Sequence, residues 1–170
     1  MARTNGIPGD IRLVAFDVDG VFTDGRFYLA DDGTETKAFH TQDGYGVRRL
    51  LQAGLAVAVI SGRESGAVSR RMAELGVEHV IQGCDDKVAA FERLLDELGI
   101  AAAQAAYAGD DIPDLPLLGR VGLPIAVANA VDEVRAAAAF VTQARGGAGA
   151  VREICDAIVS ARSGDKIRNA

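Results

Sequence analysis

Apolar and polar residues alternate along this chain on two length scales. Short apolar runs end at polar or glycine-rich turns, which is typical of strands buried on both faces of a parallel sheet. Longer segments repeat apolar residues at helical spacing and end at a glycine. The runs predict strands at about 11–17, 55–60, 79–81, 104–108, 123–128 and 139–141. The longer segments predict helices at 43–52, 64–75, 87–98, 115–120, from about 131, and at 148–161.

The regular alternation of strands and helices predicts an α/β fold. We expect a Rossmann-like three-layer sandwich with a central parallel sheet and helices on both of its faces. A chain of 170 residues suits a single domain spanning 1–170, with a polar, mobile tail at about 163–170. In open sheets of this kind, ligands bind beyond the carboxyl ends of the strands.

One segment departs from the alternation and predicts a β-hairpin at about 26–39. Two strand-like runs, 26–30 and 34–39, flank Asp31-Asp32-Gly33, and Asp-Gly between such runs is a strong hairpin signal. A lone two-stranded ribbon is marginal in water. We therefore expect the hairpin to protrude and to pack against another subunit through the apolar residues on its two faces, Phe27, Tyr28, Leu29 and Phe39.

Composition and charge exclude several classes of partner. A net charge of −6 and the lack of a basic stripe argue against nucleic acid. No apolar run approaches the length of a membrane span, and residues 1–8 lack the apolar core of a signal peptide. Cys84 and Cys155 match no metal or redox spacing, which favours reduced thiols and a cytoplasmic location. A phosphorylated small molecule remains compatible, because a few cations suffice for one phosphate.

The first predicted strand ends in an acidic turn. Asp17 and Asp19 follow the apolar run 13–16 and are followed at once by Gly20. A carboxylate at the end of a buried strand is costly without a partner, so the pair indicates a cation site at the carboxyl edge of the sheet. An acidic Asx turn explains these residues alone equally well.

Further polar residues occupy equivalent positions after other predicted strands. Each has an ordinary explanation: a helix cap for Ser61, a solvated helix-start lysine for Lys87, and a turn for Asp110 and Asp111. All of them nevertheless face one edge of the predicted sheet, together with Asp17 and Asp19. That coincidence favours a common site.

Phosphoryl transfer explains the combination of residues. The carboxylate of Asp17 can attack phosphorus, but a divalent cation and a lysine must offset its repulsion by the phosphate. Mg²⁺ suits the site, and Asp110 can supply a second ligand. Ser61 and the backbone N–H groups that follow can hold phosphate oxygens. Asp19 can protonate the leaving oxygen and then activate water.

These residues resemble the motifs of the haloacid dehalogenase-like phosphatases, and the resemblance extends from residue 11 to about residue 160. The resemblance implies that Asp17 is the nucleophile, Asp19 the acid/base and Lys87 a catalytic cation. It implies Mg²⁺ held by Asp17, the Asp19 carbonyl and Asp110, with Asp111 and Asp114 orienting Lys87 or a metal-bound water. The matching motifs stand in order: Asp17-x-Asp19-Gly-x-x-Thr23, Ser61, Lys87 and Gly109-Asp110-Asp111.

The spacing of these motifs leaves no room for a cap domain. Within the superfamily the chain is similar to a capless subfamily that hydrolyses 3-deoxy-D-manno-octulosonate (KDO) 8-phosphate for lipopolysaccharide biosynthesis. The matching segments are 17–25, 37–46, 61–63, 109–111 and 149–153. The resemblance implies a homotetramer built by the hairpins, with the sugar acid held near subunit boundaries. The substrate contacts it implies are Asp19, His40, Thr41, Gln42, Asp43, Gly44, Arg48, Ser61, Gly62, Arg63, Arg71 and Lys87.

Three alternatives remain open at this point. Relatives that act on nine-carbon KDN or sialic acid 9-phosphates tend to carry Glu where this chain has Arg63, which favours the eight-carbon acid. A phosphoacceptor domain would place its acceptor aspartate after the third strand, and a regulatory domain would not need all four motifs. Ala148 stands where relatives often have arginine, and Lys166 and Arg168 in the tail could reach a neighbouring site.

Overall fold

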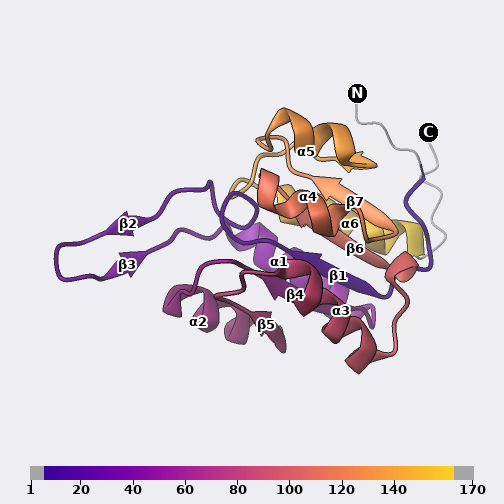
Figure 1. Ribbon diagram of the computed structural model, residues 1–170, viewed down its shortest axis with the longest axis horizontal. Coiled ribbons are helices and arrows are strands. Elements are labelled where there is room, and N and C mark those ends of the chain that lie inside the picture. The colour runs from indigo at the N-terminus through magenta and orange to yellow at the C-terminus, as the bar shows by residue number, and fades with distance from the viewer. Residues whose placement is uncertain (1–5, 163–170) are drawn as a thin grey trace.

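A six-stranded parallel sheet forms the centre of the computed structural model, which describes residues 6–162 (Figure 1). Its strand order is β5-β4-β1-β6-β7-β8, and every neighbouring pair is parallel. The strands are β1 Leu13–Phe16, β4 Ala56–Ile60, β5 His79–Ile81, β6 Ala105–Gly109, β7 Leu123–Ala126 and β8 Phe140–Val141.

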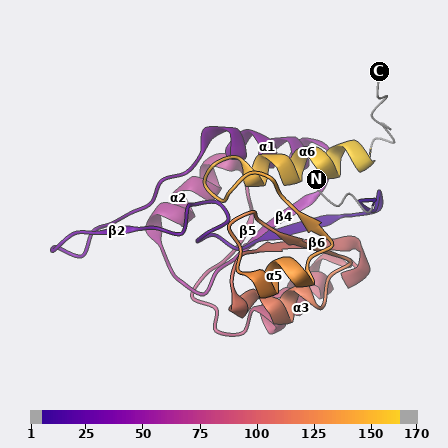
Figure 2. The same cartoon turned by 90° about the horizontal axis from the view of Figure 1, so that it is seen from above.

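Helices cover both faces of the sheet. Figure 2 shows α1 and α6 packed side by side on one face and α3 and α5 on the other. The helices are α1 Thr41–Gln52, α2 Gly66–Leu75, α3 Lys87–Leu98, α4 Leu115–Leu118, α5 Asp132–Ala137 and α6 Ala150–Arg162, with short 3₁₀ turns η1 Ala102–Gln104 and η2 Ile112–Asp114. The predicted three-layer α/β architecture is confirmed.

Strand β1 lies in the middle of the sheet, between β4 and β6. All four of its side chains are fully buried, because helices cover it from both sides, and this accounts for its unbroken apolar sequence. The chain leaves the sheet at Asp17, whose backbone N–H still donates to the carbonyl of Ala108, 2.9 Å away. The strand therefore delivers the acidic turn to the centre of the carboxyl edge, where ligands of such sheets bind.

The predicted hairpin projects from the body of the molecule, as the left side of Figure 1 shows. Its strands, β2 Tyr28–Leu29 and β3 Glu35–Thr36, are shorter than the predicted 26–30 and 34–39. The pairing is short because no third strand of residues 6–162 pairs with these two to stabilise it. Gly33 makes the turn at φ +84°, and the side chains of Tyr28 and Leu29 are 67 % exposed.

Between Ser61 and Lys87 the chain contains only α2 and β5, so no cap domain covers the carboxyl edge in residues 6–162. Over the same residues, no helix is both long enough and apolar enough to span a bilayer. The predicted tail at 163–170, with Lys166 and Arg168, lies outside the described residues.

Candidate active site

Segments from four parts of the chain surround one pocket at the carboxyl edge of the sheet. Its volume is about 300 Å³. Its walls come from the loop after β1, the loop after β4, the start of α3 and the loop after β6. The lining residues are Asp17, Asp19, Gly25, Ser61, Gly62, Arg63, Lys87, Asp110, Asp111, Pro113 and Asp114. The structure thus brings together all the motif residues that the sequence places at this edge.

Lys87 connects the carboxylates of Asp17 and Asp114. Its Nζ lies 3.0 Å from Asp17 Oδ1 and 2.8 Å from Asp114 Oδ1. The buried hydroxyl of Tyr107, on β6, donates to the same Asp114 oxygen at 2.6 Å and accepts from Lys87 at 3.2 Å. Because Lys87 is the first residue of α3, the helix fixes where the ammonium enters the pocket. Asp17 and Lys87 are therefore held in direct contact.

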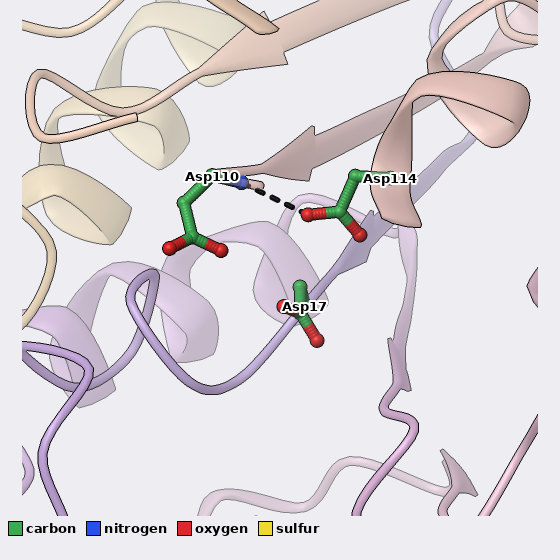
Figure 3. A group of neighbouring side chains, drawn as sticks. All are labelled: Asp17, Asp110 and Asp114. Atoms are coloured by element: carbon green, nitrogen blue, oxygen red, sulfur yellow. Dashed lines mark hydrogen bonds between the residues drawn. The ribbon is translucent and has the colours of Figure 1, made fainter. Parts of the chain in front are cut away.

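Asp110 and Asp114 are placed by the tight turn that follows β6. The backbone N–H groups of Asp110 and Asp111 donate to Asp114 Oδ2 at 2.9 and 3.3 Å, so both oxygens of Asp114 are occupied within the protein. Figure 3 shows the Asp110 and Asp17 side chains on either side of a common space beside Asp114. Carboxylate oxygens of the three residues lie within 4.8 Å of one another.

Gly20 allows the loop after β1 to pack directly on Asp110. A Cβ at position 20 would lie 1.9 Å from Asp110 Oδ2, and the residue has φ +87°. Asn129 holds the same turn from the other side, because its side chain donates to the Gly20 carbonyl at 2.9 Å. The glycine of the first motif is thus required by contact as well as by backbone conformation.

Burial and mutual repulsion raise the pKa values of the carboxylates of Asp17 and Asp110. Burial, together with the charge of Asp114, raises the pKa of Asp17 to about 6, against the opposing effect of Lys87. Burial and the charges of Asp17 and Asp114 raise the pKa of Asp110 to about 7. Burial raises the pKa of Tyr107 well above its usual value, so its hydroxyl stays protonated and donates to Asp114.

The carboxylates of this cluster carry more negative charge than Lys87 offsets, and a divalent cation would balance the excess. Asp17, Asp110 and Asp114 carry three negative charges when ionised, and Lys87 offsets one. Within residues 6–162 no side-chain cation pairs with Asp110, and its carboxylate accepts no hydrogen bond. Hard oxygen ligands around a net charge of −2 fit Mg²⁺, which binds through a few carboxylates and keeps several waters. The Asp110 carboxylate is available for such an ion, and Asp17 can share its carboxylate between the ion and Lys87, whereas both oxygens of Asp114 are occupied.

Asp19 lies on the hairpin side of the pocket, away from this cluster. Its carboxylate is paired with the ammonium of Lys37, and the guanidinium of Arg63 lies 3.9 Å away. Ser61 is buried at the end of β4, and its hydroxyl accepts from the Arg63 N–H at 3.3 Å. The pocket therefore presents Asp17 and Asp114 beside Lys87, and Asp19 beside two different cations, Lys37 and Arg63.

Several predicted substrate residues lie elsewhere on this chain and do not line the pocket. Asp43 is buried, and its Oδ1 accepts from the Arg152 N–H in the first turn of α6. His40 caps the start of α1. Arg48 donates to the Glu74 carbonyl, and Arg71 pairs with the Glu74 side chain. Their role in substrate binding stays a prediction, as does that of the remaining residues of this stretch, Thr41, Gln42 and Gly44.

Asp111, which was expected to orient Lys87 or a water, does not touch Lys87. Its Oδ1 accepts from the Ile112 N–H and caps η2. Asp114 alone makes the predicted contact with the lysine.

Sequence reasoning missed three polar residues that support the site. Lys37, which follows the hairpin, contacts Asp19, and Tyr107, within β6, contacts Asp114. Asn129 bridges Gly20 to Gly146. For Lys37 a signal exists, because Glu35 and Lys37 alternate with Thr36 and so share one face of a strand. No local pattern distinguishes Tyr107 or Asn129 from ordinary core and turn residues.

Comparison with known proteins agrees with this geometry. A family model of haloacid dehalogenase-like hydrolases matches residues 80–154. The 3-deoxy-D-manno-octulosonate 8-phosphate phosphatase KdsC of Escherichia coli K12 is 46 % identical over 153 residues, which cover 90 % of this chain and 81 % of that protein. The Yersinia pestis enzyme of the same name is 44 % identical over 161 residues, covering 95 % and 85 %.

Solved structures show the same likeness. A crystal structure of the Yersinia pestis phosphatase has a TM-score of 0.90 at 44 % identity, covering 91 % of this chain and 84 % of that one. The Moraxella catarrhalis phosphatase, crystallised with magnesium, phosphate and KDO, has a TM-score of 0.89 at 46 % identity, covering 92 % and 90 %.

Fold, motif geometry and relatives agree on the class of protein, the haloacid dehalogenase-like hydrolases, and on phosphatase chemistry. Within that class, the chain belongs to the family of KdsC phosphatases.

Proposed function

We propose that this protein is a Mg²⁺-dependent phosphatase that hydrolyses KDO 8-phosphate to KDO and inorganic phosphate, for lipopolysaccharide biosynthesis. The observation that carries the proposal is the contact of Asp17 with Lys87 beside Asp110, in a pocket that also contains Asp19 and Ser61. The relatives named as KDO 8-phosphate phosphatases, and the one crystallised with magnesium, phosphate and KDO, support the choice of substrate and metal.

Asp17 is the nucleophile in this proposal. One of its carboxylate oxygens attacks phosphorus while the bond from phosphorus to the sugar oxygen breaks, which leaves an aspartyl-phosphate and the sugar alcohol. Lys87 is 3.0 Å from Asp17 Oδ1 and offsets negative charge on the transferring group. Asp114 and Tyr107 keep the ammonium at this place. The hydroxyl of Ser61 and the neighbouring backbone N–H groups bind phosphate oxygens.

Asp19 is the general acid and base. It gives a proton to the departing sugar oxygen in the first step. In the second step its carboxylate takes a proton from water, the water oxygen bonds to phosphorus, and the bond from phosphorus to Asp17 breaks. The products are inorganic phosphate and an unchanged enzyme.

Asp17, the backbone carbonyl of Asp19 and Asp110 would hold Mg²⁺. When bound, the ion supplies positive charge that lets an anionic carboxylate approach an anionic phosphate. Asp110, with no side-chain cation of its own in the described part of the chain, has no other evident partner for its charge.

Recognition of the sugar acid requires cations beyond the metal site. Arg63 lines the pocket and is half exposed, so its guanidinium can reach the substrate carboxylate. The other proposed contacts, at 40–44, Arg48 and Arg71, do not line the pocket of one chain. They join the site only if the substrate extends along the surface towards a neighbouring subunit.

We further propose a cytoplasmic homotetramer assembled through the hairpin. The apolar side chains of Tyr28 and Leu29, 67 % exposed near the tip of a hairpin that projects from the body of the molecule, support an interface there. Light scattering of the wild type should give the mass of four chains. Replacing Tyr28 and Leu29 with serine should reduce that mass, whereas Ile112→Ser, at another exposed apolar residue, should not. An unchanged tetramer in the hairpin variant would rule out this interface.

A panel of phosphate esters tests the substrate most directly. Purified protein with Mg²⁺ should hydrolyse KDO 8-phosphate with a higher kcat/KM than KDN 9-phosphate, sialic acid 9-phosphate or a neutral hexose 6-phosphate. Asp17→Asn should abolish turnover of every ester. Faster turnover of a nine-carbon acid phosphate would transfer the assignment to that class. An active Asp17→Asn variant would refute the nucleophile.

A further inference from the structure

Four side chains at the edge of the pocket form a closed ring in which negative and positive groups alternate. Asp19 is paired with Lys37 and lies 3.9 Å from Arg63 Nε. Glu35 closes the ring, with oxygens 2.9 Å from Arg63 Nη2 and 3.8 Å from Lys37 Nζ. We call these residues, Asp19, Lys37, Glu35 and Arg63, the charged ring. Asp19 and Arg63 line the pocket. Glu35 lies on strand β3 of the hairpin, and Lys37 directly follows that strand.

Burial fixes the geometry of the hairpin half of this ring. The side chain of Lys37 is fully inaccessible, and a buried ammonium is stable only when it is paired. Glu35 and Lys37 are two residues apart on an extended segment and so project to the same side. The guanidinium of Arg63 also lies over the ring of Phe27, 4.1 Å from its centre. The base of the hairpin therefore contacts Arg63 on two sides.

The two residues of the charged ring that line the pocket, Asp19 and Arg63, need contacts that hold their side chains in place. Asp19 lies beyond the end of β1, where strand pairing no longer fixes the backbone, and its side chain is about a quarter exposed. Arg63 lies in the loop before α2 with its side chain about half exposed, and a free arginine of this kind samples many rotamers. An acid/base must lie within hydrogen-bond reach of the leaving oxygen, and small misplacements are costly to the rate.

We propose that Lys37 and Glu35 are positioning residues of the active site. Lys37 fixes the carboxylate of Asp19 for proton transfer, and Glu35, together with Phe27, directs Arg63 to the carboxylate of the substrate. This inference rests on the proposed function. It gives the hairpin a role within its own subunit, as a support for the acid/base and for the residue that selects the sugar acid.

Lys37→Met tests the first part, because it keeps the length of the side chain and removes the charge. The readout is the rate of phosphoryl transfer to the enzyme, measured by rapid mixing for two esters with different leaving groups. Nitrophenolate leaves without needing a proton, whereas the sugar alkoxide does need one. We expect the rate with KDO 8-phosphate to fall on the order of 100-fold and the burst with p-nitrophenyl phosphate to change less than about 3-fold. Arg26→Met is the matched control, an exposed hairpin cation outside the ring.

Glu35→Gln tests the second part and does not depend on whether Lys37→Met folds. We expect KM for KDO 8-phosphate to rise on the order of 10-fold, because Arg63 loses a charged partner. The KM for p-nitrophenyl phosphate, which has no carboxylate, should stay unchanged.

Equal loss for both esters in Lys37→Met, or no loss, would overturn the role of Lys37. An unchanged KM for KDO 8-phosphate in Glu35→Gln, or an equal rise for both esters, would overturn the role of Glu35. Failure of the proposed function gives a different result, because the wild type would then not hydrolyse KDO 8-phosphate at all.

Discussion

At the scale of single residues, the site depends on a glycine packed so closely against Asp110 that no side chain would fit there. Gly20 and Gly33 both have positive φ, +87° and +84°, but their surroundings differ. A Cβ at position 20 would collide with Asp110, whereas a Cβ at position 33 would meet nothing within 4 Å. The pair therefore separates the effect of backbone strain from the effect of displacing Asp110.

Gly20→Ala should weaken Mg²⁺ binding by roughly 10- to 100-fold, because Asp110 must move away from the metal site. Gly33→Ala should lower the free energy of unfolding by about 1 kcal/mol and leave Mg²⁺ affinity unchanged. Calorimetric titration of both variants with Mg²⁺ measures the difference. Equal affinities in the two variants would show that the loop around Gly20 does not support the metal site.

The raised pKa of Asp110 predicts a dependence of stability on pH in the absence of metal. Its pKa is about 7 in the folded protein and about 3.9 in the unfolded chain. Between these values the folded state binds the proton more tightly, so this residue contributes stability at low pH that is lost as the pH rises towards about 7.

Asp110→Asn should remove that loss. Without metal at pH about 7.5, the variant should unfold on the order of 10 °C above the wild type, and the difference should vanish near pH 4. Excess Mg²⁺ should raise the unfolding temperature of the wild type and not that of the variant. A difference that is the same at both pH values would contradict the assignment of the titration to Asp110.

At the scale of elements, hydrophobic periodicity and glycine stops predict most of the fold. The observed ends of β5 and α3 coincide with the predicted ones, because the apolar pattern and Gly99 define them locally. The start of α1 was misplaced by two residues, since His40 caps the helix before the first apolar position. Helix α2 begins at Gly66 and not at 64, because Ser65 is the N-cap and has an extended backbone, with φ −149° and ψ 123°.

The candidate site was predictable only in part, for a related reason. Asp17, Lys87 and Asp110 stand at strand ends or a helix start, and parallel topology alone brings such positions together. Lys37 and Tyr107 reach the site from a hairpin and from within a strand, so only tertiary packing places them there. Sequence patterns define where an element ends, but they do not show which distant side chain will neutralise a buried charge.

Asp43 illustrates an element held by a distant residue. Its carboxylate accepts from the Arg152 N–H and so stabilises the start of α6, against which α1 packs. Asp43→Ala should lower the free energy of unfolding by about 1–2 kcal/mol in urea. Gln52→Ala, at an exposed position of the same helix outside the predicted substrate contacts, should leave the free energy of unfolding unchanged. A raised KM with unchanged stability would instead support the predicted substrate contact at Asp43.

At the scale of the whole molecule, the active-site pocket is open because no cap domain covers it in the described residues. The projecting hairpin lies beside this pocket and contributes to it. Asp17 and Asp110 follow strands at the carboxyl edge of the sheet, and the start of α3 supplies Lys87. The base of the hairpin supplies Lys37 and Glu35 beside Asp19 and Arg63. Assembly through the hairpins would then bring further surface to a site that a single chain leaves open to solvent.

The central claim is that Asp17 accepts the phosphoryl group. Enzyme quenched during turnover of KDO 8-phosphate and reduced with borohydride converts an aspartyl-phosphate into homoserine, which peptide mass spectrometry locates. The account predicts homoserine at position 17 alone, and none without substrate. Homoserine at position 19 or 110, or full turnover with no reducible intermediate at position 17, would contradict it.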